Sequence, residues 1–248
     1  MGLKSLRAGA LAGVAAGLAL AVLPAVGAAA PAQHVNATDH VVGHNKNAQQ
    51  SGNWSGYAET GSGYTSAEAT WTVPSVSASS SDTYSSAWVG IDGDGNSNLI
   101  QTGTEADYTG GSAHYNAWWE ILPAAETPID SMTISPGDSM TASVAQDSGS
   151  TWTINIADNT TGQNFSTQQQ YGGSGGSVEY IQEAPEINGN IAQIADFSTF
   201  DFSNLKVNGN SPGLTSDDEI LLVQNGTTYS TPSAPNSSGD GFSVSYTG

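Results

Sequence analysis

The chain has 248 residues and no cysteine, and its 23 Asp and Glu residues outnumber 4 Lys and Arg, giving a net charge of −19 at pH 7. The absence of cysteine excludes disulfide bonds, a cysteine nucleophile and a Cys-ligated zinc site. The negative charge excludes nucleic acid and anionic membranes as partners. The negative charge also favours activity at low pH, because protonated carboxyl groups no longer repel one another. A surface that serves only solubility is the alternative interpretation.

The first thirty residues have the three parts of a secretory signal peptide. Lys4 and Arg7 precede an almost wholly apolar run, which ends in small residues before Pro31. A transmembrane helix is the alternative, because the apolar run is long enough to span a bilayer. We expect residues 1–30 to be removed and the mature protein to be secreted, with two basic residues left against 23 acidic ones.

Residues 31–50 differ from the rest of the chain. They contain no aromatic residue and no alternation, but they include His34, His40, His44 and Lys46. This composition predicts a short pro-segment or a disordered leader. Such a basic segment either lies over the acidic domain before export is complete or is an inert tail.

From residue 51 onwards, short alternating runs are separated by Gly, Ser, Asn and Pro. Clear examples are residues 67–73, 139–145, 151–157 and 242–246. Period-two alternation between turn residues is typical of β-strands, and no stretch has a helical period. The sequence therefore predicts one all-β domain over residues 51–248, a sandwich of two antiparallel sheets that is concanavalin-like or jelly-roll-like. The Gly-Gly-Ser-Gly-Gly run at 172–176 predicts a mobile hairpin loop.

Several hydrolytic mechanisms are excluded by the residues that are missing. Beyond the leader only His114 remains, which is too few histidines for a Ser-His-Asp triad or a His-Glu-x-x-His zinc site. Asp147-Ser148-Gly149 resembles the aspartic peptidase signature, but a second copy is missing. Residues 92–98 resemble the start of a calcium loop, yet they lack its later Gly and Glu, so a turn between two strands is favoured. Hydrolysis would therefore depend on carboxylates, amides and aromatic residues.

Six short motifs follow one another from residue 53 onwards. They are Asn53-Trp54-Ser55-Gly56, Ala87–Gly93, Ile100–Gly103, Tyr115–Glu120, Thr160–Gln163 and Ile181–Glu183. In this order and spacing they resemble the glutamic peptidases, or eqolisins. The resemblance implies two packed antiparallel sheets with a concave substrate cleft, and acid endopeptidase activity on proteins and peptides without metal or cofactor. We expect the mature protein to be a monomer that binds neither nucleic acid nor membrane.

The same resemblance assigns two catalytic residues. The glutamine of the family's Ile/Leu-Gln-Thr-Gly motif falls on Gln101, and the glutamate that ends its Glu-aromatic-Ile-x-Glu motif falls on Glu183. Glu179 begins that motif and lies on the same face of a strand, so alternation alone leaves both glutamates open. The family's pattern favours Glu183.

Further residues match positions that the family places in or beside its substrate groove. These are Trp54, Trp88, Trp118, Asp92, Glu105 and Glu120. A place in the core is the alternative for the tryptophans. Gln182 stands where the family has an aliphatic residue, Tyr180 where Phe or Trp is usual, and Glu105 where Asp is frequent, which leaves the details of the subsites open.

The two assigned residues suit peptide hydrolysis in acid. An ionised Glu183 would take a proton from the attacking water and return it to the leaving amine. An unperturbed glutamate titrates near ~4.3, so an ionised fraction persists in mild acid. Gln101 would donate an amide N–H to the oxyanion, and deleting one such donor elsewhere costs about 3–4 kcal/mol. The alternatives are a sandwich that binds or cleaves carbohydrate, where carboxylate pairs also occur, and a secreted structural domain.

Overall fold

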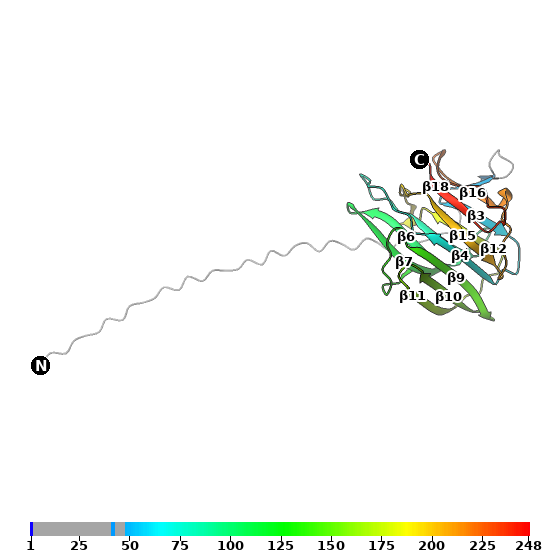
Figure 1. Ribbon diagram of the computed structural model, residues 1–248, viewed down its shortest axis with the longest axis horizontal. Helices are drawn as coiled ribbons and strands as arrows, with labels where there is room; N and C mark the ends of the chain where they lie inside the picture. Colours follow the sequence, from blue (N-terminus) through cyan, green and yellow to red (C-terminus); the bar gives the residue numbers. More distant parts are fainter. Residues whose placement is uncertain (2–40, 43–47) are drawn as a thin grey trace.

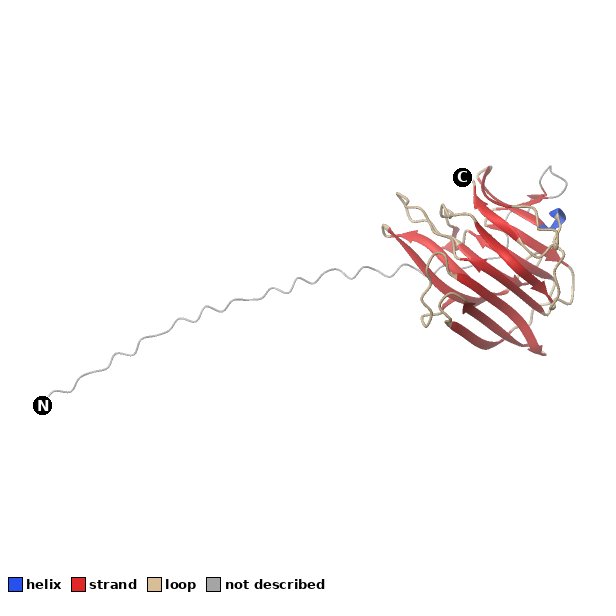
Figure 2. Ribbon diagram, viewed as in Figure 1, coloured by secondary structure: helices blue, strands red, loops and turns tan. Residues whose placement is uncertain are grey.

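The computed structural model describes Met1, residues 41–42 and residues 48–248. The expected signal peptide and most of the expected leader lie outside the described residues. The regular structure of the described part consists of strands joined by loops and turns, with one short helical turn, η1 (Ser216–Asp218) (Figure 2). The prediction of an all-β domain is confirmed. Among the described residues, no helix has the length and apolar character that crossing a bilayer requires.

Strands succeed one another along the whole of the described chain. In chain order they are β1 (Val41–Val42), β2 (Ala48–Ser51), β3 (Trp54–Thr60), β4 (Ser66–Thr72), β5 (Ser86–Ile91), β6 (Ile100–Thr109), β7 (Ser112–Ile121), β8 (Thr127–Pro128), β9 (Ser139–Ser148), β10 (Thr151–Asp158), β11 (Asn164–Gln170), β12 (Ser177–Glu183), β13 (Glu186–Ile187), β14 (Asn190–Ile191), β15 (Phe200–Val207), β16 (Glu219–Gln224), β17 (Thr227–Pro232) and β18 (Phe242–Tyr246).

All but two of these strands belong to one hydrogen-bonded sheet. Its main path runs β11-β10-β9-β4-β15-β18-β17-β16-β3-β12-β5-β6-β7-β8, and β2 joins it through β16. The pairing between β2 and β16 is parallel, while the strands along the main path pair antiparallel. β13 and β14 form a separate two-stranded sheet.

The long sheet folds over into two packed layers. β5 and β6 contact β4, β9 and β10, although these strands lie far apart along the hydrogen-bonded path. In one layer, β15, β4, β9 and β10 lie side by side (Figure 1); this is termed the β4 layer. The other, termed the β12 layer, contains β3, β12, β5, β6 and β7. The predicted sandwich of antiparallel strands is thus present, with its two layers continuous through β17 and β16.

The hydrophobic core lies between the two layers. Trp71 of β4 and Ile154 of β10 belong to the same buried cluster as Val89 of β5 and Tyr180 of β12. On β10 buried and half-buried residues alternate, because one face of the strand meets this core and the other meets solvent. In β12, by contrast, every residue is buried. β12 is therefore covered on both faces.

The glycine-rich run at 172–176 does not form a hairpin, and that prediction was wrong. The run connects β11 to β12, and these two strands are not neighbours in the sheet. It carries the chain from one end of the strand order to a strand in its middle. A Gly- and Ser-rich composition indicates that the chain changes direction, but it does not indicate which strands are joined. The residues at 92–98 do join consecutive paired strands, β5 and β6, as expected.

Gln182 generates a prediction about stability. Its side chain is fully buried, and neither amide atom has a hydrogen-bond partner in the described structure. An unsatisfied buried polar group costs about 1–3 kcal/mol. We therefore expect Gln182→Leu, which has a similar volume, to raise the free energy of unfolding by about 1–2 kcal/mol in urea denaturation. Gln170→Leu, at an exposed position on β11, is the matched control. A lower stability of Gln182→Leu would mean that the amide is satisfied in solution.

Candidate active site

The β12 layer has a second hydrophobic cluster on the face that points away from the core. This face of β3, β12, β5, β6 and β7 is termed the site face. The cluster on it consists of Trp54, Ala58, Trp88, Leu99, Trp118, Ile181 and Ile220. Because side chains alternate along a strand, neighbours such as Tyr57, Val89 and Tyr180 point into the core instead.

All the predicted site residues except Asp92 occupy positions of the site face. They are buried, although many are polar or charged: Trp54, Trp88, Gln101, Glu105, Trp118, Glu120 and Glu183. The sequence motifs were therefore separated along the chain but belong to five adjacent strands. Strand pairing brings them together.

The strand register arranges these residues in rows across the site face. Gln101 is paired with Gly90 on one side and Glu120 on the other. Glu183 is paired with Trp54 and Ser86, and Ser86 is paired in turn with Glu105. The row between these two contains Ile181, Trp88, Gly103 and Trp118. Gln101 and Glu183 thus share a face and lie on either side of a row of indoles.

The carboxylate of Glu183 accepts hydrogen bonds from two side chains on neighbouring segments. Trp88 Nε1 donates to its Oε2 at 2.7 Å, and Asn53 Nδ2 is 3.4 Å from its Oε1. The Trp54 ring packs edge-on against Trp88, with ring centroids 5.1 Å apart. These contacts fix the position of a carboxylate that is fully buried. Asn53 was noted in the sequence only as part of a motif, and its contact with Glu183 required the structure.

The amide of Gln101 is oriented by Glu120. Gln101 Nε2 donates to Glu120 Oε2 at 2.7 Å, while Gln101 Oε1 has no partner among the described residues. An ionised carboxylate can only accept hydrogen bonds, so the nitrogen of the amide must face Glu120. One amide N–H and the carbonyl oxygen of Gln101 are left for other partners.

Gly103 makes room for the row of indoles between the two polar residues. A Cβ atom at this position would lie 2.4 Å from the carbonyl oxygen of Ala87, 2.6 Å from Trp88 Cβ and 3.0 Å from Trp118 Cζ2. The Trp118 indole itself is held by a hydrogen bond from Nε1 to Ser86 Oγ at 3.0 Å. Any side chain at 103 would push Trp88 and Trp118 apart. Gly103 was named only as a motif residue, and its packing role became visible in the structure.

Glu179 shares the site face with Glu183 but has different surroundings. It lies in the row of Gln101, across Gly90. A Cβ atom at Gly90 would meet Trp88 Cζ3 at 3.0 Å and Leu99 Cδ1 at 3.1 Å, so these side chains fill the space between Glu179 and Gln101. Burial raises the pKa of Glu179 well above its ordinary range, and the nearby Asp94 and Asp92 carboxylates also raise it. A carboxyl group in these surroundings stays neutral in acid.

Asp92 directly follows β5, at the edge of the site face. Its carboxylate holds the 172–176 loop: it accepts hydrogen bonds from Tyr171 Oη at 2.6 Å, Gly176 N at 2.7 Å, Gly175 N at 3.1 Å and Ser174 Oγ at 3.1 Å. Burial acts to raise the pKa of Asp92, but these hydrogen bonds outweigh it and lower the pKa. The contacts give Asp92 a structural role. Among the described residues, no three His, Cys, Asp or Glu side chains are grouped as a metal ion would require.

Comparison with known proteins gives one family for this arrangement. Residues 52–246 match the peptidase A4 family. Aspergillopepsin-2 of Aspergillus niger is 32% identical over 226 residues, which cover 81% of this chain and 79% of that protein. Scytalidopepsin B of Scytalidium lignicola is 32% identical over 202 residues, covering 77% and 73%.

A solved structure agrees with both sequence comparisons. Scytalido-glutamic peptidase with a transition state analog inhibitor superposes with a TM-score of 0.67 at 31% identity, over 79% of this chain and 98% of that one. The resemblance to glutamic peptidases in the sequence motifs is therefore confirmed. The chain belongs to the peptidase A4 family, the eqolisins, and is a glutamic-type endopeptidase.

Proposed function

We propose that the chain is an acid-active endopeptidase in which Glu183 and Gln101 act together on a water molecule and the scissile peptide bond. The observation that carries this proposal is the placement of both residues on the site face around Trp88. The indole of Trp88 donates to Glu183 at one end, and its other edge faces Gly90, the register partner of Gln101. Glu179 is the other register partner of Gly90 and the rival for the role of general base, and the motif pattern of the family is what favours Glu183.

The reaction begins with ionised Glu183 as general base. It takes one proton from water while the water oxygen attacks the carbonyl carbon of the substrate, which gives a tetrahedral intermediate with a negative oxygen. The amide N–H of Gln101 that does not bind Glu120 donates to this oxygen. Glu183 then transfers its proton to the amide nitrogen of the substrate, the C–N bond breaks, and the amine product leaves. The carboxylate is ionised again at the end of the cycle.

Gln101 suits this role because its charge does not change with pH. A histidine or lysine donor would need a proton of its own, whereas an amide donates across the whole acid range. Glu120 keeps the amide nitrogen turned towards the reacting centre by accepting one of its two N–H groups. Gln101 Oε1 is free to accept a hydrogen bond from the attacking water.

The proposed substrate site includes the aromatic residues of the site face. Trp54, Trp88 and Trp118 are fully buried in the described structure, where their large, rigid rings pack beside the two proposed catalytic residues. Glu105 lies in the row of Glu183, across Ser86. Scytalido-glutamic peptidase has been solved with a peptide based transition state analog, which supports a peptide as the ligand of this chain. Asp92 acts on the site only indirectly, through the loop that it holds.

The same proposal includes the N-terminal region. Residues 1–30 direct the protein out of the cell, and residues 31–50 form a leader that is removed before or during activation. The composition supports an extracellular, acidic working environment, because 23 carboxyl residues are balanced by few cations.

The assignment of the two catalytic residues can be tested by substitution. We expect Glu183→Gln to lower kcat about 10²- to 10⁴-fold, because the general base is lost. Gln101→Ala should lower kcat about 10²- to 10³-fold, because one oxyanion donor is lost. Cleavage of a protein substrate at pH 4, with circular dichroism to verify the fold, measures both effects. Glu179→Gln is the matched control and should keep most of the activity. Full activity of folded Glu183→Gln would disprove the assignment.

The pKa of Glu179 predicts how stability depends on pH. Its folded-state pKa is raised, so its contribution to stability is fully present below the unfolded value near ~4.3 and is lost as pH rises through the folded value. We expect Tm of the wild type to fall by several degrees between pH 5 and pH 8. Glu179→Gln should fall less over the same range, whereas Glu186→Gln, on β13, should behave as the wild type does. Parallel curves for all three proteins would show that Glu179 does not control this loss.

Inhibitors test the proposed absence of metal and of an aspartic pair from the mechanism. We expect EDTA to leave activity unchanged, because the proposed chemistry uses only a carboxylate and an amide. Pepstatin should also fail to inhibit, because no aspartic dyad is involved. Activity at pH 4 with and without each compound is the measurement. If EDTA abolished activity and added calcium restored it, the 92–98 turn would instead have a functional role.

A further inference from the structure

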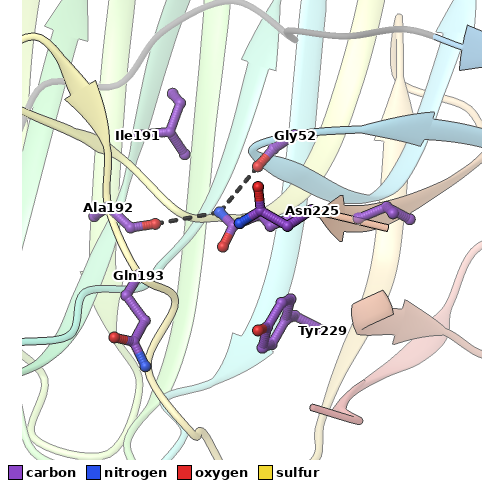
Figure 3. Close-up of a pocket in the computed structure, with 8 residues that line it drawn as sticks. Gly52, Ile191, Ala192, Gln193, Asn225 and Tyr229 are labelled. Atoms are coloured by element: carbon purple, nitrogen blue, oxygen red, sulfur yellow. Dashed lines mark hydrogen bonds between the residues drawn. The ribbon is translucent and has the colours of Figure 1, made fainter. Parts of the chain in front are cut away.

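A pocket of about 540 Å³ lies between the β16–β17 hairpin and the segment that follows β14 (Figure 3). Its volume is within the range of pockets that bind small ligands. None of the motifs that the sequence singled out lines this pocket, although Gly52, which does line it, directly precedes the motif that begins at Asn53. The pocket is therefore a feature that the proposed reaction does not yet use.

Two hydrogen bonds hold the walls of the pocket together. Gln224 Nε2 donates to the carbonyl oxygens of Gly52 at 3.0 Å and Ala192 at 3.2 Å, and these bonds are the dashed lines in Figure 3. They tie the end of β16 to both segments on the other side of the pocket. Its shape is thus fixed by the fold and does not depend on a ligand.

Hydrogen bonds also connect the pocket to Glu183. Gly52 precedes Asn53, whose amide nitrogen lies 3.4 Å from Glu183 Oε1. On the other wall, Ala192 N donates at 2.9 Å to the carbonyl oxygen of Pro185, two residues after Glu183. The walls of the pocket are therefore connected to the segment of Asn53, which contacts Glu183, and to the segment that directly follows Glu183.

The pocket is lined by apolar side chains and by side-chain amides. Ile191, Val223 and the ring of Tyr229 give apolar walls, and Gln193 and Asn225 give neutral polar groups. Figure 3 shows Gln193 and Tyr229 on opposite sides of the space. No described lining residue has a carboxylate or an ammonium group. A cationic side chain would lose its hydration here without gaining a partner, and the charge of −19 disfavours an anionic one.

We propose that this pocket is a specificity subsite, which takes a bulky uncharged side chain of the substrate within a few residues of the cleaved bond. The inference rests on the proposed peptidase function and adds a determinant of sequence preference. It predicts that the enzyme discriminates among peptides at this position by size and charge.

The test is a peptide library in which each position within four residues of the scissile bond is varied in turn. Wild type should show a preference for Leu, Phe or Tyr over Ala and Lys at one of these positions. Gln193→Glu places a carboxylate in the wall at an exposed position, and at pH 5 it should raise the kcat/KM ratio of Lys to Leu there about fivefold. Val223→Phe should lower kcat/KM for bulky side chains at the same position about tenfold and leave Ala substrates nearly unchanged.

Gln170→Glu on β11 is the matched control, since it adds the same charge at an exposed position far along the strand order. If the wild type cleaves the library and both pocket variants show the same residue preferences as the wild type, the pocket is not a subsite. If the wild type cleaves no peptide at any pH, the proposed function itself fails, and the subsite with it. A change confined to the predicted position supports the inference.

Discussion

The indole of Trp88 is the feature on which the geometry of the site depends. It is fully buried, so its N–H needs an acceptor, and Glu183 provides it at 2.7 Å. The ring can lie flat along the sheet only because Gly90 and Gly103 lack side chains on the strands around it. One aromatic side chain therefore sets the position of the Glu183 carboxylate, the proposed general base, and its row lies between Glu183 and Gln101.

The same layer places two glutamates in opposite situations. Glu183 faces two side-chain N–H donors, whereas Glu179 lies beneath Leu99 and Trp88 and is close to the Asp92 and Asp94 carboxylates. A buried carboxyl group without compensating donors is tolerated when it is neutral, and it is neutral in acid. Burial of Glu179 is thus compatible with low pH, where its carboxyl group is neutral, whereas neutral pH favours a buried negative charge at this position. This agrees with the acid activity proposed from the composition.

Asp92 shows how a residue beside the site can serve the fold. Four of its five donors come from Tyr171 and the residues that follow it, and they hold the crossing from β11 to β12 in place, while the fifth is Asn96 Nδ2. The strand that carries Glu183 starts directly after this crossing. An acidic residue that the motifs predict next to the substrate therefore also positions a strand of the site face.

The sequence by itself determined the strands, the family and the identity of the two proposed catalytic residues. Alternation is a local property, so runs such as 151–157 and 242–246 could be recognised from their neighbours alone, and the motifs around Gln101 and Glu183 are contiguous. Tertiary structure decided which strands are neighbours, how the 172–176 run crosses between strands, and what separates Glu179 from Gln101. It also decided that Gly52, Ala192 and Gln224 meet to form a pocket. These features depend on the register between strands that are distant in the chain, and no local pattern encodes that register.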